Sequence, residues 1–130
     1  MDKDIVIHNF WSSFGIPAYD ENSVPDDKDI AEINGSAFPR ITYDVVQGDT
    51  FDTVAMSGSV WDRSSSWNGV YEIFNQINDT LSNGGVILPC NGGALWIKKA
   101  SPWVQRMGDS SDDAIRRLFM NISVEFITNN

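Results

Sequence analysis

Two side chains in this sequence could act as a base or a nucleophile, and each type occurs only once: His8 and Cys90. A reactive thiol needs an adjacent base or a helix N-terminus to lower its pKa, and the segment around Cys90 offers neither. No Gly-x-Ser-x-Gly, Walker A, dinucleotide-binding or His-Glu-x-x-His motif accompanies His8. One thiol and one imidazole are also too few for a structural zinc site. We therefore expect a protein that is not an enzyme, with no catalytic residue, no metal and no cofactor.

Aspartates could supply oxygen ligands for calcium or paired carboxylates for hydrolysis. Asp109, Asp112 and Asp113 are close in the sequence, but their spacing departs from the Asp-x-Asp-x-Asp-Gly loop and its closing Glu. We interpret them as members of a solvated loop. Four other aspartates lie on or beside predicted strands without a distinguishing neighbour: Asp44, Asp49, Asp52 and Asp62. An acidic sequence contains such pairs by chance, so they do not indicate carboxylate-pair hydrolysis.

The five tryptophans are candidates for binding surfaces, because Trp, Tyr and Arg are favoured anchors at protein interfaces. Trp11 and Trp67 fit helix faces and are expected in the core. Trp61 is expected on the outward face of its strand, and Phe119 and Ile127 lie opposite the apolar row of the last strand. A sheet with apolar groups on both faces either has helices on one face and a partner on the other or is twisted around a larger core, and we favour the partner.

The composition is that of one globular domain. The chain has 130 residues, 42% of them hydrophobic and 12% aromatic, and domains most often contain about 100–150 residues. Its formal net charge is −9, so the clustered cations of a duplex-binding protein are not expected. No apolar run reaches the roughly 18–20 residues that span a bilayer, and the first residues are acidic where a signal peptide is basic.

The first half of the chain predicts a helix, an acidic loop and a hairpin. Asp4–Phe14 has helical spacing and is followed by Gly15 and Pro17. Residues 1–34 contain eight acids and two bases, a net of −6, and residues 19–36 are rich in turn formers, which predicts an extended acidic loop. Phe38–Val46 and Thr53–Asp62 alternate with period two and predict a β-hairpin around a turn at Gln47–Thr50.

The second half predicts one strong helix and several strands. Three serines at 64–66 can cap a helix whose apolar residues recur at spacings of three and four from Trp67 to Leu81, and Asn83-Gly84-Gly85 ends it. The remaining predicted elements are strands at Val86–Pro89 and Ala94–Lys99, a polar loop at Ser101–Asp113 and a strand at Ala114–Thr128. This order predicts one α+β domain over residues 1–130, an antiparallel β-sheet with two helices packed on one face.

Parts of this sequence resemble the tail-terminator (tail-completion) proteins of long-tailed bacteriophages. The resemblance is carried by Phe-Pro-Arg-Ile-Thr-Tyr at 38–43, by a hairpin ending in Val-Trp-Asp-Arg-Ser at 60–64, by the serine- and tryptophan-capped helix and by the closing strand at 118–127. It covers about residues 36–128. Such proteins form a closed ring, usually hexameric, that caps the tail tube and joins it to the head connector.

The resemblance implies a structural virion protein in the tail or neck region, present in the host cytoplasm during assembly. Its partners would be further copies of itself, the tail-tube protein and the head-tail connector protein, without a membrane. DNA would only pass through the lumen, because an acidic wall repels the phosphate backbone. The residues we expect at subunit contacts are Trp61, Arg63 and Trp103, and those expected in an end loop are Asp109, Asp112 and Asp113.

Two other readings of the sequence stay open. A head-tail connector or tail-tube subunit could be built from a similar small domain, and a tube subunit would polymerise where a terminator stops at one ring. A small-molecule binding module is the alternative outside phage assembly. It would need a concave apolar pocket with converging polar groups, and the sequence identifies none.

Overall fold

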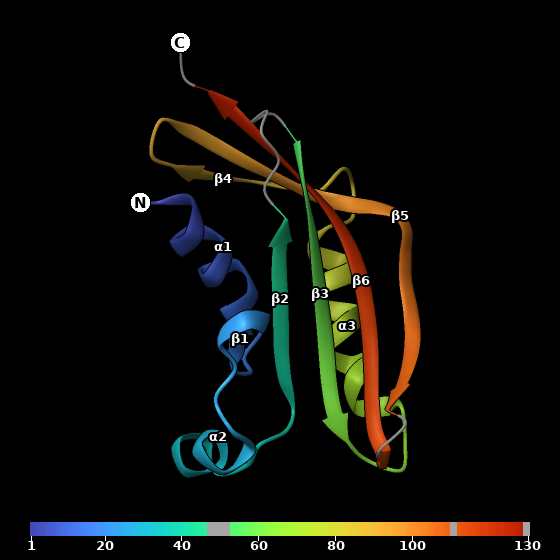
Figure 1. Cartoon of the computed structure of the whole chain (residues 1–130). Helices are drawn as coiled ribbons and strands as arrows, with labels where there is room; N and C mark the ends of the chain where they lie inside the picture. The colour runs from blue at the N-terminus through green and yellow to red at the C-terminus, as the bar shows by residue number, and fades with distance from the viewer. Residues whose placement is uncertain (47–52, 110–111, 129–130) are drawn as a thin grey trace.

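The computed structural model describes residues 1–46, 53–109 and 112–128, which form an α+β fold (Figure 1). Its helices are α1 (Lys3–Ser12), α2 (Asp27–Asn34) and α3 (Asn68–Thr80), and a 3-10 helix, η1, covers Glu21–Ser23. The predicted α+β class is confirmed, and so are the helices expected near residues 4–14 and 67–81. The turn predicted at Gln47–Thr50 lies outside the described residues.

Six strands form one sheet in the spatial order β1-β2-β3-β6-β5-β4. The strands are β1 (Ala18–Asp20), β2 (Arg40–Val46), β3 (Thr53–Arg63), β4 (Val86–Cys90), β5 (Gly93–Asp109) and β6 (Asp112–Thr128). The predicted hairpin is confirmed as the antiparallel pair β2–β3. β1 runs parallel to β2, so the sheet is mixed, and the expectation of a wholly antiparallel sheet is wrong for this one pair.

The core lies on one side of the central strands β3 and β6. Alternate residues of β6 are at most 2% exposed: Leu118, Met120, Ile122 and Val124. Trp11 of α1 lies against Gly58 of β3, which pairs with Met120, and the buried residues of α3 belong to the same cluster. The period-two pattern of the sequence therefore predicted the buried row of β6 correctly.

Local hydrogen bonds explain where α3 begins and ends. The Ser66 hydroxyl accepts a hydrogen bond of 3.1 Å from the Asn68 amide, which satisfies one of the free donors of the first turn. Asn83, Gly84 and Gly85 all have positive φ after the helix, the backbone geometry that ends a helix. Four residues of α3 are buried at the predicted spacing: Val70, Ile73, Phe74 and Ile77.

The acidic segment at 19–36 is not the extended loop that its composition predicted. It contains the end of β1, η1 and the two-turn helix α2. Ile30 is fully buried, the Arg40 guanidinium pairs with Asp27 at 2.7 Å, and Gly35 closes the helix at φ 85°. One buried side chain is too little to produce an apolar period, so sequence patterning could not reveal a helix held by tertiary contacts.

The polar loop predicted at Ser101–Asp113 is also wrong. β5 continues to Asp109 and β6 already begins at Asp112. The register with β6 shifts between Lys99 and Val104 and again between Gly108 and Asp109. Pro102 lies in the first of these irregular stretches, where a strand tolerates a residue without an amide donor. The polar residues of this segment form a strand because β6 supplies a partner for their backbone.

Candidate functional site

The face of the sheet opposite α1 and α3, called here the open face, carries an aromatic and cationic cluster. It is built by Trp61 on β3 and by Arg117 and Phe119 on β6. The Arg117 guanidinium carbon lies 4.3 Å from the centroid of the Trp61 ring and 5.4 Å from that of Phe119. Arginine stacked on aromatic rings in this way gains cation–π attraction. The cluster supplies the apolar groups that the sequence placed on the second face.

Hydrogen bonds hold this cluster in place. The Trp61 Nε1 donates to Thr42 Oγ1 at 2.8 Å, and the Arg117 Nε donates to Ser59 Oγ at 2.9 Å. Thr42 and Ser59 are 5% and 2% exposed, so both hydroxyls are buried and satisfied. Burial lowers the pKa of Arg117, and Glu21, whose Oε1 lies 3.7 Å from a terminal nitrogen of Arg117, raises it. The rings are therefore presented in a fixed geometry, as interface anchors are.

All five arginines of the chain lie near one end of the sheet, called here the arginine end. Arg40, Trp61 and Arg117 form one cross-strand row. The other three arginines lie within two positions of that row: Arg63, Arg106 and Arg116. Although the net charge of the chain is −9, this arrangement gathers every arginine near one end of the sheet.

The arginines at this end differ in their partners. Arg40, Arg63 and Arg117 pair with carboxylates of Asp27, Asp112 and Glu21, respectively. Arg106 and Arg116 form no ion pair with a carboxylate of the described residues and stack on the Trp67 ring instead, at 4.8 Å and 5.5 Å. These two are the cations of the arginine end whose charge is not neutralised by a neighbour.

Two of the three predicted contact residues, Trp61 and Arg63, share a face of the sheet, because they are two positions apart on β3. Trp61 lies on the open face, whereas Trp103 of β5 packs against α3, with its Nε1 donating to Asn78 Oδ1 at 3.0 Å and its ring 5.8 Å from Phe74. Arg63 lies at the end of β3 and pairs with Asp112. Trp61 and Arg63 are therefore on the open face, and Trp103 is on the side of the sheet that α3 covers.

The predicted end-loop residues lie where the long strands β5 and β6 meet. Asp109 is the last residue of β5 and is paired in the strand register with Asp112, the first residue of β6. Asp113 is exposed. No group of three or more His, Cys, Asp or Glu side chains within residues 1–46, 53–109 and 112–128 is arranged to hold a metal ion.

His8 occupies a shallow polar site on α1. Its Nδ1 lies 3.0 Å from the Tyr43 hydroxyl and its Nε2 lies 3.3 Å from the Ser12 hydroxyl. Burial raises the pKa of Tyr43, and the carboxylates of Asp20 and Asp4 raise it further. Both ring nitrogens are thus engaged by neutral groups, and among the described residues no carboxylate bonds to the ring to orient it as a catalytic base.

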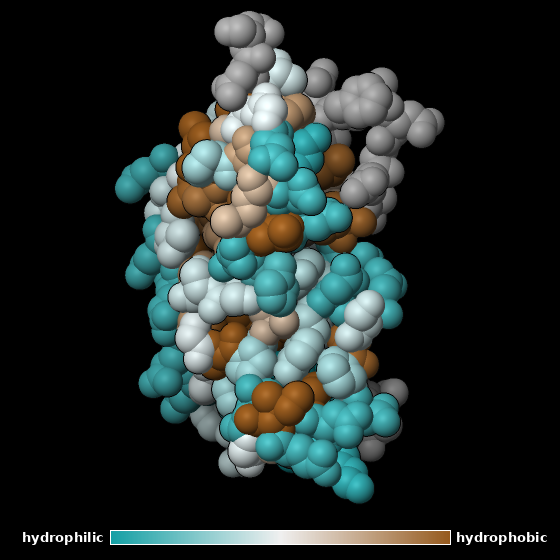
Figure 2. Space-filling view, turned by 90° about the vertical axis from the view of Figure 1, so that its left-hand side faces the viewer, coloured by the Kyte–Doolittle hydropathy of each residue, from teal (hydrophilic) through white to brown (hydrophobic). Residues whose placement is uncertain are grey.

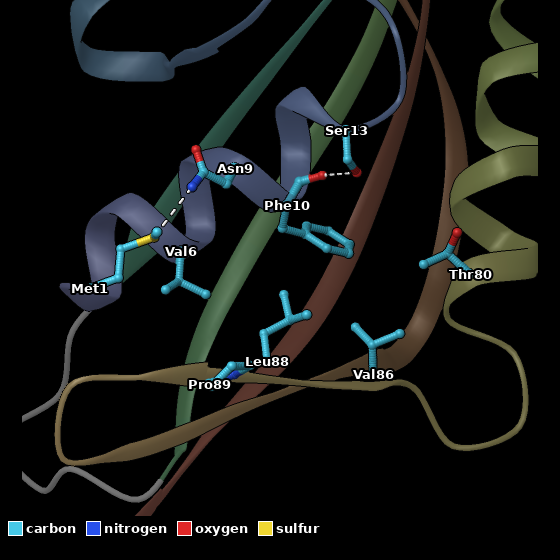
Figure 3. A pocket seen from close by; sticks show the side chains of 9 residues that line it. All are labelled: Met1, Val6, Asn9, Phe10, Ser13, Thr80, Val86, Leu88 and Pro89. Carbon is cyan, nitrogen blue, oxygen red and sulfur yellow. Dashed lines mark hydrogen bonds between the residues drawn. The ribbon is translucent and has the colours of Figure 1, made fainter.

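An apolar groove of about 380 Å³ lies between α1, the end of α3 and β4 (Figure 3). Its lining residues are Met1, Val6, Asn9, Phe10, Ser13, Thr80, Val86, Leu88 and Pro89. The hydroxyls of Ser13 and Thr80 donate to backbone carbonyls of their own helices, at 2.6 Å and 2.8 Å, and the Asn9 amide to Met1 sulfur. The groove can accept an apolar group, but its polar side chains are already occupied.

Sequence reasoning did not identify Arg106, Arg116 and Arg117 as members of a cluster. Their cluster depends on the register between strands far apart in the chain, and the only early signal was that four of the five arginines lie near predicted strand ends. No helix within the described ranges is long and apolar enough to cross a membrane. No protein-family model matches the sequence, and no curated protein sequence is significantly similar to it.

Proposed function

We propose that this chain is a structural virion protein that forms a ring, capping the end of a phage tail tube and joining the tail to the head connector. The observation that supports this most is the open face. Trp61 and Phe119 stand on the side of the sheet opposite α1 and α3 and are held by Arg117, which is the composition of an interface core. A protein that works by assembly needs such surfaces and does not need a catalytic cleft.

The shape of the sheet also suits a wall between two partners. β5 and β6 are each 17 residues long, which corresponds to roughly 55 Å of extended chain at about 3.3 Å per residue. In Figure 1, α2 lies near one extremity of the elongated sheet and β4 near the other. In the proposed ring, one end contacts the tail tube and the other contacts the connector.

The charge distribution is compatible with DNA passing through such a ring. The acids of the first 34 residues, which have a net charge of −6, lie on α1, η1 and α2 at one lateral side of the molecule. On that side, hydrophobic groups are separated by hydrophilic ones (Figure 2). A ring built from chains of this net charge would repel the phosphate backbone and leave DNA free to slide.

The mass of the protein in solution tests the proposal. Light scattering on a sizing column, over a concentration series with and without tail tubes, should show a discrete species near six subunits, or a monomer that forms rings when tubes are added. A protein that stays monomeric at every concentration, with or without tail tubes, contradicts the proposal. Long polymers would instead favour a tail-tube subunit, and a ring that binds connectors but no tubes would favour a connector.

The apolar groove favours a second candidate function, a small-molecule binding module. Its volume of about 380 Å³ falls within the range of about 300–1,000 Å³ that ligand pockets occupy. The hydroxyls of Ser13 and Thr80 argue against this second function, because both already donate to backbone carbonyls. Titration with a fluorescent apolar probe separates the two: saturable binding that Leu88→Asp abolishes, by a chain that never assembles, would favour the binding module.

A further inference from the structure

The arginine end includes a free lateral edge of the sheet. β4 pairs only with residues 93–97 of β5, so the described part of β5 from Val104 onward pairs with β6 alone and forms the edge. Arg106 lies on this edge and is exposed. Trp67, Tyr71 and Arg116 adjoin it, and with Arg106 they make up what we call the arginine platform.

The arginine platform is arranged to receive an anion beside an apolar group. The Arg106 Nε donates to the Tyr71 hydroxyl at 2.9 Å and its guanidinium lies over Trp67 at 4.8 Å. Arg116 lies on the same ring, and its buried Nε has no hydrogen-bond partner among the described residues. A terminal nitrogen of Arg116 donates to the Ser65 carbonyl at 3.3 Å. The other terminal N–H groups of the two guanidiniums donate to no described residue, so they can pair with carboxylates.

The opposite lateral edge carries the complementary groups. α2 lies beside β1 and β2, across the whole sheet from the lower part of β5 (Figure 1). It exposes Asp29, Glu32 and Ile33, and Ile33 is the most exposed of the large hydrophobic residues described, at 80%. Neither of these two acids forms an ion pair with a described cation.

The two surfaces lie at the same height along the strands. α2 is tied by Asp27 to Arg40, and Arg40 belongs to the cross-strand row that ends in Arg117. Arg106 and Arg116 are each one register position from that row. Translating one copy sideways and rotating it about an axis parallel to the strands therefore brings α2 of one molecule against the arginine platform of the next.

We infer that the partner of the arginine platform is a second copy of this chain, whose helix α2 docks there. Ile33 packs on the rings of Trp67 and Tyr71 while Asp29 and Glu32 pair with the guanidinium groups. The contact joins two different surfaces and can therefore close into a ring. This inference rests on the proposed function, because it names the subunit contact of that ring.

Charge reversal on both sides tests the contact. Arg106→Glu and Glu32→Arg should each raise the protein concentration needed for half-assembly roughly tenfold, since each puts like charges opposite one another. The double variant, Arg106→Glu with Glu32→Arg, should recover assembly because it restores opposite charges across every interface. Ile33→Arg removes the apolar contact at a site that is already exposed, so it should block assembly without affecting folding. Sedimentation velocity measures the fraction of ring in each case.

Matched controls isolate the contact from general charge effects. Lys99→Glu changes another cation of β5 that lies over a tryptophan, Trp103, and Asp79→Lys changes another exposed helix acid. Both should assemble as the wild type does. If the wild type forms rings and Glu32→Arg and Ile33→Arg form them equally well, the inference is overturned while the proposed function stands. If the wild type stays monomeric even with tail tubes, the proposed function fails, and the inference fails with it.

Discussion

The six-membered edge of the Trp11 indole lies directly over Gly58. A Cβ atom at Gly58 would stand 2.7 Å from Cζ2 and 2.9 Å from Cζ3 of that ring, closer than real Cβ contacts come. Trp11 is fully buried and stacks on Tyr43 at 6.2 Å between ring centroids. The absence of a side chain on β3 is thus what allows α1 to pack against the sheet.

Gly58→Ala should therefore destabilise the protein by about 1–3 kcal/mol, the usual cost of overpacking a core. Chemical denaturation followed by circular dichroism measures the change. Gly108→Ala is the matched control, because a Cβ there meets nothing within 4 Å, and its free energy of unfolding should stay close to that of the wild type. Trp11→Phe removes the indole edge that lies over Gly58. In that background, Gly58→Ala should lower the free energy of unfolding by less than it does in the wild type. An equal cost in both backgrounds would show that the ring is not the cause.

Ile30 should anchor α2, although it is the helix's only buried residue. Ile30→Ala should lower the free energy needed to unfold α2 by about 2–5 kcal/mol, the range for truncating a buried isoleucine. Amide hydrogen exchange across Asp27–Asn34 should therefore become faster. Ile33→Ala, on the exposed side of the same helix, should change neither stability nor exchange. Equal exchange in the two variants would contradict the role given to Ile30.

Ser59 should stabilise the open face through Arg117. Ser59→Ala leaves the half-buried Nε of Arg117 without its acceptor, and we expect destabilisation of about 1–3 kcal/mol. Ser57→Ala is the control, since Ser57 lies on the same face of β3 and accepts no bond from Arg117. Trp61 fluorescence should shift in the Ser59 variant only. If both variants unfold at the same denaturant concentration, the hydrogen bond contributes nothing measurable.

Tyr43 should make stability depend on alkaline pH. Burial, Asp20 and Asp4 raise its pKa above the ordinary value of 10.0 in the folded state, so above that pH the unfolded chain releases a proton that the folded chain retains. Stability from this group is fully present below pH 10 and is lost as the pH rises through the folded pKa. The stability advantage of the wild type over Tyr43→Phe should shrink between about pH 9 and pH 12. A constant difference over this range would contradict the raised pKa.

Periodicity in the sequence was enough for the elements whose burial repeats regularly. Met56, Val60 and Leu118 alternate along strands, and Val70 and Ile77 recur along a helix, because each of these elements presents one continuous side to the core. Trp61 and Phe119 indicated the open face in advance, because they are apolar residues at strand positions whose side chains point away from the core. α2 was not predicted, because Ile30 is its only buried residue and one buried residue produces no apolar periodicity.

What the sequence alone determined about this protein is its α+β class, the sides of its main strands and helices that are buried, and its acidic charge, all of which depend on neighbours along the chain. Only the tertiary structure decided that β1 joins in parallel, that β5 continues through Pro102, and that five arginines meet at one end. These features depend on which strand lies beside which and in what register. The pairing of β3 with β6 joins residues more than fifty positions apart, and no local pattern specifies it.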